Sequence, residues 1–458
     1  MKLFAKNNKI DMLTAPLFKK MVLFALPVLF TNVLQLLYNH ADQIVVGQYN
    51  GTTAFAAIGS TSSLIHLVIN VFMGIAVGVN VAVAHKLGAN KTEDAEKILH
   101  TAVIFAVISG VAISIIGVLL STTFLRWMKS PEDVIDLSST YLKIYFLGAP
   151  FSLLYNFCAA AMRAKGQSQK PLTFLTISGA VNVILNLFFV IVCNLSVAGV
   201  AIATVISQAL SAVLAIISLS KDDGGCRLSL KKLKFDGKSF AIIAKIGFPA
   251  GIQSSVFSIS NVLIQSTINS YGSVVMAGNT AAQNVESYLN AAAGSIYQSE
   301  LAFIGQNYGA KRPKNIKKII FNAFSLMVGT MAVLSLVVIL FDDTVLKLFN
   351  PDPSAIEAAK IRLSINCGFY VLYGCMELAV GIMRGLGHGV TPMLVALAGV
   401  CGTRLLWLFF VYPIAPSLTL LYTSYPVSWG LAMAAHLISF LIVRKKTFAK
   451  MNTTQTDI

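Results

Sequence analysis

The sequence predicts an all-α integral membrane protein with twelve transmembrane helices in two parallel-repeat six-helix lobes. Its 458 residues are 56% hydrophobic and only 12% charged, whereas a soluble globular domain carries about 25% charged residues. The apolar residues come in runs of about 20 or more, the length that a helix needs to cross about 30 Å of hydrocarbon. Short motifs also recur at one fixed offset along the chain, which indicates a duplication.

Charged or turn-rich breaks divide the apolar residues into twelve predicted spans. Several spans exceed 25 residues, so we expect tilted or kinked helices. Pro27, Pro150 and Pro249 lie inside such runs and are candidate kinks, because proline lacks the backbone donor that a helix needs. The predicted spans are residues 17–47, 53–84, 98–122, 136–162, 171–194, 197–220, 240–270, 277–306, 317–341, 357–383, 391–414 and 421–443.

Basic residues are distributed unequally between the two sets of breaks. If the N-terminus is cytoplasmic, the inner breaks hold 27 Lys and Arg and the outer breaks hold three. This positive-inside pattern predicts a multi-pass protein of the cytoplasmic membrane with both termini in the cytoplasm. The net charge of +16 therefore reflects topology, and no nucleic-acid partner is expected. The first run is too long for a signal peptide and is expected to remain as a span.

The sequence shows no catalytic motif. It contains no Walker, HExxH, paired-His or Ser/Lys motif, so neither an ATPase nor another enzyme is expected, and no cofactor is expected beyond a coupling ion. The six cysteines form no CxxC pair and mostly lie inside predicted spans. They are interpreted as small buried apolar residues rather than a disulfide or metal framework.

The internal duplication is visible in two pairs of motifs. "KLGANKTEDAEK" (86–97) corresponds to "NYGAKRPKNIKK" (307–318) at a shift of 221. "MRAKGQSQKP" (162–171) corresponds to "MRGLGHGVTP" (383–392) at the same shift. A shared offset over such a distance is hard to obtain by chance.

The duplication predicts how the chain is organised. We expect an N-terminal six-helix lobe at 1–220, a basic cytoplasmic linker at 221–238 and a C-terminal six-helix lobe at 239–458. Because six is an even number of spans, both lobes have the same orientation in the membrane. Parallel repeats of this kind occur in secondary transporters, whose binding sites lie near the middle of the membrane.

The stretch "LLYNHADQIVVGQ" (36–48) places Asp42 within the first apolar run. A carboxylate at this depth is costly, and such residues are usually functional. The alternative is a structural acceptor that joins two helices. Asp42 by itself does not decide between these two roles, which depend on the kind of membrane protein that surrounds it.

Five segments of the chain resemble the multidrug and toxic compound extrusion (MATE) family. They are "GANKTEDAEK", "GQNYGAKR", "MRAKGQSQKP", "MRGLGHGVTP" and the outer-loop "KSPEDVIDLSSTYLKI". Their order, spacing and duplication match the family from about residue 15 to 445. The resemblance implies a two-lobed transporter that opens alternately to each side and exports cationic or amphipathic compounds in exchange for Na⁺ or H⁺.

The resemblance also implies an ion-coupling site in the N-terminal lobe, made of Asp42, Asn182, Asn186 and Thr204. The spacing of the two asparagines places them on one helix face. With Asp42 they would offer oxygens to Na⁺ as metal ligands, or a polar pocket for a protonatable carboxyl group. The identity of the ion stays open, and the alternative for the neutral residues is hydrogen bonding between helices.

The C-terminal lobe departs from the family pattern. Some members carry an acidic residue after the proline that matches Pro249, and "PAGIQSSVFSIS" lacks it. Glu286 and Glu300, with Gln283, are instead the candidates for a cavity that binds cationic substrates. For Glu286 the alternative is a structural ion pair.

Two further charges lie within predicted spans of this lobe. Arg404 cannot face lipid cheaply, and Glu377 in the preceding span is the partner that we expect. A structural ion pair between them is the favoured interpretation.

The predicted function is that of a monomeric antiporter in the lipid bilayer that exports small organic cations. One alternative is a lipid-linked saccharide flippase of the same superfamily, which would line its cavity with several Arg or Lys. Arg404 is the clearest deep cation in the sequence, which disfavours it. The other alternative, a membrane-embedded enzyme, would need a catalytic motif that the sequence lacks.

Overall fold

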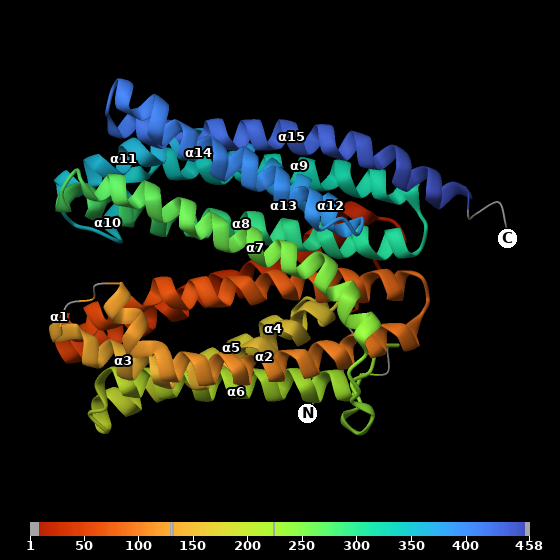
Figure 1. The fold of residues 1–458 in the computed structure, drawn as a ribbon, viewed down its shortest axis with the longest axis horizontal. Helices are drawn as coiled ribbons and strands as arrows, with labels where there is room; N and C mark the ends of the chain where they lie inside the picture. Colours follow the sequence, from red (N-terminus) through yellow and green to blue (C-terminus); the bar gives the residue numbers. More distant parts are fainter. Residues whose placement is uncertain (1–8, 129, 131, 223–224, 454–458) are drawn as a thin grey trace. The chain divides into compact units, whose positions relative to one another are not determined.

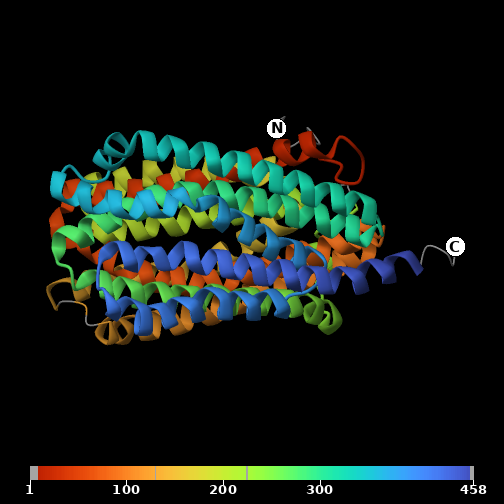
Figure 2. The same ribbon diagram turned by 90° about the horizontal axis from the view of Figure 1, so that it is seen from above.

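The computed structural model describes residues 9–128, 130, 132–222 and 225–453, and these residues form helices and loops without a β-strand. The chain divides into two compact units. Within each unit the long helices run side by side along one direction (Figures 1 and 2). The first unit comprises Met1–Ile10 and Phe30–Gly247, and the second comprises Asp11–Leu29 and Phe248–Ile458.

The first unit is built from α1 after residue 29, five further α-helices, a π-helical turn and the short 3-10 helix η3 (Leu230–Lys232), and it ends within the first turns of α7 (Gly237–Asn269). α1 is unusually long and contains two candidate membrane spans, Leu17–Tyr49 and Val68–Gly88. The elements are α1 (Leu17–Gly88), α2 (Thr92–Trp127), α3 (Glu132–Leu147), α4 (Ala149–Ala164), α5 (Gln169–Leu187), η2 (Phe188–Val192) and α6 (Ser196–Ser220).

The second unit contains the remaining helices. The last helix, α15, ends the unit. The elements are α7 (Gly237–Asn269), α8 (Ser273–Gly309), α9 (Pro313–Leu340), α10 (Asp342–Lys347), α11 (Pro353–Gly368), α12 (Tyr370–Gly385), α13 (Val390–Ala396), η4 (Leu397–Gly402), α14 (Thr403–Leu406), η5 (Trp407–Val411), η6 (Tyr412–Ile414) and α15 (Leu418–Thr453).

The helices account for the predicted crossings. Within the described residues, nine helices are long and apolar enough to cross a membrane, or eleven if each of two bent pairs is one span. α8 is 37 residues long and is not among them. It is more polar because it carries Glu286, Glu300 and several Asn and Gln side chains. With α8 the crossings number twelve, as the sequence predicts.

Two spans are bent at equivalent places in the two units. α3 and α4 meet at 48°, and α11 and α12 meet at 52°. The residues at the breaks, Gly148 and Phe369, are 221 residues apart, which is the offset of the sequence repeat. Pro150 lies in the first turn of α4, so the first bend occurs at a predicted proline kink. Pro27 and Pro249 lie inside α1 and α7.

Small residues allow close packing in the first unit. A Cβ atom at Gly110 of α2 would overlap the backbone of Pro150 in α4. Helices in membranes associate by van der Waals contact rather than by the hydrophobic effect, so small residues at crossings bring the backbones together. Gly110 therefore fixes the approach of α2 to the bend between α3 and α4.

The segment that leads into α7 is tied to α2 by hydrogen bonds. The backbone N–H of Ser229 donates to His100 Nε2 (3.0 Å), and that of Asp236 donates to Thr101 Oγ1 (3.1 Å). Asp236 then caps α7, where it accepts from the N–H and hydroxyl of Ser239. These hydrogen bonds from Ser239 hold the pKa of Asp236 below its usual value. The lobe and linker boundaries taken from the sequence stay a prediction.

The start of the chain packs on the second unit. Asn307 Nδ2 on α8 donates to the carbonyl oxygen of Met12 (2.8 Å), and Ser299 Oγ donates to that of Met21 (3.2 Å). Arg312 Nη1 donates to the carbonyl oxygen of Leu13 (2.8 Å). Residues 11–29 therefore belong to the second unit by contact.

A buried ion pair lies at the end of the first unit. The Lys165 side chain is fully buried, and its Nζ lies 3.0 Å from Asp222 Oδ2. Lys165 also donates to the carbonyl oxygen of Cys226 (2.8 Å), and Gln167 Nε2 donates to Asp222 Oδ2 (2.8 Å). One carboxylate thus neutralises a lysine that has no access to water.

Asp222→Asn is expected to destabilise the protein by about 3–5 kcal/mol, because it leaves Lys165 as an uncompensated buried charge. The control is Asp94→Asn, which removes a half-exposed pair with Lys86 (2.8 Å) and should cost about 1 kcal/mol or less. The measurement is thermal unfolding of the detergent-purified variants. Equal stability of the two variants would show that the Lys165 pair contributes no more than a surface pair.

Candidate functional site

The structure brings together the four residues that the sequence places in the ion-coupling site. Asp42 on α1 is buried, with 7% of its surface exposed. Asn186 Nδ2 on α5 donates to Asp42 Oδ1 (2.5 Å) and to Asn182 Oδ1 (3.2 Å). Thr204 Oγ1 on α6 donates to Asp42 Oδ2 and accepts from Asn182 Nδ2, each at 3.4 Å. Three helices therefore contribute to one polar cluster, and the role of this cluster in ion coupling stays a prediction.

Local packing positions this cluster. Asn182 and Asn186 are one helical turn apart on α5 and are both buried, so their amides face the same side. One turn earlier, a Cβ atom at Gly179 would overlap the ring of Tyr38 on α1. This glycine lets α1 approach α5 closely enough for Asp42 to reach the asparagines.

The chemistry of the cluster suits a monovalent cation or a proton. It has one carboxylate and three neutral side chains, so its formal charge is at most −1. The buried Asn186 Oδ1 has no hydrogen-bond partner among the described residues. Carboxylate, amide and hydroxyl oxygens are the ligands that hard cations prefer. Within the described residues, no group of three His, Cys, Asp or Glu could hold a metal ion.

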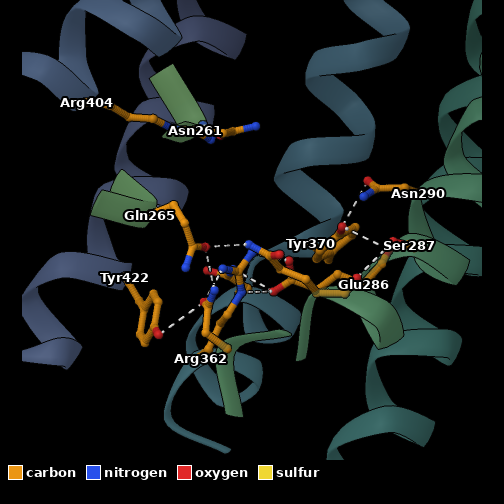
Figure 3. Close-up of polar contacts among 12 residues, drawn as sticks. Asn261, Gln265, Glu286, Ser287, Asn290, Arg362, Tyr370, Arg404 and Tyr422 are labelled. Carbon is orange, nitrogen blue, oxygen red and sulfur yellow. Dashed lines mark hydrogen bonds and ion pairs between the residues drawn. The ribbon is translucent and has the colours of Figure 1, made fainter. Parts of the chain in front are cut away.

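Glu286 in the second unit forms a buried ion pair (Figure 3). Arg362 on α11 donates from Nε to Glu286 Oε1 (2.9 Å) and from Nη2 to Glu286 Oε2 (2.6 Å). Asn366 Nδ2 also donates to Oε1 (2.8 Å), while Arg362 Nη1 donates to Asn279 Oδ1 (2.6 Å). The carboxylate is therefore neutralised and held on both oxygens, which is the geometry of a structural pair.

The other residues predicted for the substrate cavity do not gather around Glu286 in one group. Gln283 is exposed and donates to Gln265 Oε1 on α7 (3.3 Å). Glu300 lies 14 residues after Glu286 on α8, which is about 21 Å along the helix axis at 1.5 Å per residue. It is fully buried, and neither of its oxygens has a hydrogen-bond partner among the described residues.

The ion pair expected between Glu377 and Arg404 is wrong. Arg404 Nε donates to Ser428 Oγ (3.1 Å), and Arg404 Nη1 donates to Asn261 Oδ1 (3.0 Å). No ion pair joins Arg404 to Glu377 in the described part of the chain. Arg404 instead takes neutral acceptors on α15 and α7, and Glu377 is not among its described partners.

The sequence interpretation missed Arg362, although a signal for it was present. Arg362 lies inside the predicted span 357–383, and charges within spans usually pair with one another. The expectation that charges within spans pair with one another would have pointed to Glu286 as the partner of Arg362. Arg384 is also buried, and it donates to the Tyr297 hydroxyl and to Gln253 Oε1, each at 2.8 Å.

Known proteins resemble this chain over nearly its whole length. Probable multidrug resistance protein YoeA of Bacillus subtilis (strain 168) is 27% identical over 443 residues, which cover 92% of this chain and 96% of that protein. Multidrug export protein MepA of Staphylococcus aureus (strain N315) is 23% identical over 434 residues, covering 93% of this chain and 94% of MepA.

Solved structures share the fold. "Crystal structure of MATE in complex with MaL6" aligns with a TM-score of 0.88 at 20% identity and covers 98% of this chain and 100% of that one. A second structure also has a TM-score of 0.88, at 19% identity, and covers 98% of this chain and 99% of its own. Its title is "Reverse polarity of binding pocket suggests different function of a MOP superfamily transporter from Pyrococcus furiosus Vc1 (DSM3638)".

The family model described as MatE matches the chain twice, at residues 27–188 and 249–410. The two matches begin 222 residues apart, which confirms the duplication inferred from the motifs. Together they cover well over half of the chain. This protein therefore belongs to the MATE family of multidrug efflux transporters and is a multi-pass membrane protein.

Proposed function

We propose that this protein is a monomeric secondary antiporter of the cytoplasmic membrane, with both termini in the cytoplasm. It exports amphipathic compounds, organic cations among them, and takes up Na⁺ or H⁺ in exchange. The observation that carries this proposal is the buried cluster of Asp42, Asn182, Asn186 and Thr204. A lone carboxylate among neutral side chains at membrane depth can exchange a cation without leaving a large residual charge.

The cluster supplies a route from ion binding to a change of conformation. Na⁺ would be held by Asp42, Asn182 and Asn186, where the unpartnered Asn186 Oδ1 is available as a ligand. A proton would instead bind Asp42 and remove the acceptor charge that Asn186 Nδ2 and Thr204 Oγ1 now face. In both cases occupancy changes the contacts between α1, α5 and α6, and an ion can shift a conformational equilibrium only through such differences.

The proposal predicts transport driven by one ion gradient. Purified protein in liposomes that contain a fluorescent organic cation is given a Na⁺ gradient and a pH gradient in separate experiments. One gradient should drive movement of the dye, and empty liposomes serve as the control. If neither gradient moves any tested amphipathic compound above the control, the antiport proposal is wrong.

A flippase remains the second candidate because the second unit holds more deep arginines than the sequence indicated. Arg362 and Arg404 are both buried within predicted spans, and Arg384 is buried just after the end of one. Arg404 is therefore not the one deep cation of this unit. The same liposomes can be loaded with a fluorescent polyprenyl diphosphate sugar. Its movement between leaflets, together with no response of the organic cation to either gradient, would favour the flippase.

A further inference from the structure

The charges around Glu286 do not balance. Two guanidinium groups, those of Arg362 and Arg404, contact the ring of Tyr425, at 5.2 Å and 4.2 Å from its centroid. Glu286 is ion-paired with Arg362. Arg404 makes hydrogen bonds only to neutral acceptors, the Ser428 hydroxyl and the Asn261 amide oxygen. This cluster therefore carries one positive charge without a counterion among the described residues.

The uncompensated charge belongs to a buried residue. Only 6% of the Arg404 surface is exposed, and a cation at membrane depth is costly unless it is paired or faces a polar cavity. The contact with Tyr425 and the two neutral hydrogen bonds offset part of that cost. The Nη2 group of Arg404 makes no hydrogen bond to a described residue, so two of its N–H donors remain available.

One exposed amide lies next to this arginine, and others lie further along the same unit. Asn261 on α7 accepts from Arg404 and is itself exposed, and Gln283 and Asn290 on α8 are exposed as well. Figure 3 shows Arg404 and Asn261 together, with Gln265 one turn further along α7. An amide side chain within a span does not face lipid without cost, so we infer that Asn261 contacts water. A solute in that water can reach Asn261.

We propose that Arg404 and Asn261 form a subsite for the anionic group, a carboxylate or a phosphate, of an amphipathic substrate. The planar guanidinium matches the two oxygens of such a group, and its available Nη2 donors lie beside an exposed amide. Bound there, the anion supplies the counterion that Arg404 lacks. The inference rests on the proposed export function and adds to its substrates amphipathic molecules with an anionic group, zwitterions included.

The neighbouring carboxylate does not offer a competing cation site. Both Glu286 oxygens accept hydrogen bonds from Arg362, and Oε1 also accepts from Asn366. An incoming organic cation would have to displace an ion pair that is already desolvated. The net charge of the cluster repels cations and attracts anions, so the subsite orients a zwitterion by its acidic end.

The test is equilibrium binding to the purified full chain in nanodiscs. The probes are N-dansylglycine, its neutral amide and the phosphate monoester of N-dansylethanolamine, each followed by fluorescence. Wild-type protein should bind at least one anionic probe about tenfold or more tighter than the amide. A hydrogen bond between charged groups supplies the binding free energy for a difference of that size. The tighter of the two anionic probes identifies the group that the subsite prefers.

Variants assign the preference to Arg404. Arg404→Gln should abolish it, whereas Arg404→Lys should keep part of it because the charge remains. Lys347→Gln removes one positive charge from an exposed position on α10 and should bind as wild type does. If wild-type protein binds the amide as tightly as both anionic probes, or if a folded Arg404→Gln keeps the full preference, the proposal is wrong.

This experiment separates the subsite from the antiport mechanism. Binding requires no gradient, and Asp42→Asn lies in the other unit and should leave the preference unchanged. Anion selectivity without gradient-driven export would contradict the antiporter alone. Gradient-driven export without anion selectivity would contradict the subsite alone.

Discussion

Asp42→Asn is expected to abolish gradient-driven export while the protein stays folded and inserted. The substitution keeps the size and shape of the side chain, and an amide oxygen can still accept from Asn186 Nδ2, which lies 2.5 Å from Asp42 Oδ1. It removes the one charge of the cluster. Since hydrogen bonds to charged groups are worth about 1.5–3 kcal/mol, affinity for a coupling cation should fall by about 10- to 100-fold.

The coupling itself should be lost, because a neutral amide binds no proton at physiological pH and attracts Na⁺ only weakly. The readout is efflux of a fluorescent organic cation from liposomes under the gradient that drives the wild type. Substrate binding in the absence of a gradient should persist, because the substitution changes ion binding in the first unit alone.

A control variant for Asp42→Asn lies on α6. Ser211 is buried and bonds to Ser178 Oγ (2.6 Å), two turns from Thr204 and outside the cluster. Ser211→Ala should transport nearly as wild type does. Full gradient-driven efflux by Asp42→Asn at wild-type expression would place the coupling carboxylate elsewhere, with Glu300 and Glu377 as the next candidates.

The four residues of the first-unit cluster could be predicted because the resemblance to the MATE family points to them, and local signals agree for three of them. Asp42 is a charge inside an apolar run, and Asn182 and Asn186 have the spacing of one helix turn. The contact that closes the cluster could not be predicted. Gly179 is one of 32 glycines in the chain, and only the structure shows that the ring of Tyr38 occupies the space of its missing side chain.

The polar network of the second unit was predicted less well for a physical reason. Hydropathy gives the length and order of spans, but it does not give the rotation of each helix about its axis. Glu377 and Arg404 lie in consecutive spans, yet Arg404 bonds to Ser428 and Asn261 instead of Glu377. Glu286 and Arg362 are 76 residues apart, and only packing brings them together.

Neutralising Glu286 is expected to destabilise the second unit and to reduce export of all substrates alike. The pair with Arg362 is buried, with side-chain exposures of 8% and 4%. Removing one partner of such a pair typically costs about 3–5 kcal/mol, because the other charge is left uncompensated. In Glu286→Gln that charge would be Arg362, which already lies near the charge of Arg404, because both guanidinium groups contact the ring of Tyr425.

A control from the same helix is Gln283→Ala. Gln283 is exposed and bonds to Gln265 only at 3.3 Å, so its loss should change stability by no more than about 0.5 kcal/mol. Thermal unfolding of the purified variants measures both effects. The double variant Glu286→Leu with Arg362→Leu should recover much of the loss, because replacing a whole buried pair by apolar side chains is often neutral.

Transport separates a structural Glu286 from one that contacts substrate. A structural pair predicts that Glu286→Gln lowers export of cationic and neutral compounds by the same factor, in proportion to the folded protein that remains. A direct contact predicts selective loss of cations at unchanged stability, and that outcome would contradict the pairing argument. The bidentate geometry favours the first result, because an oxygen that already accepts from a buried guanidinium offers a substrate amine little further stabilisation.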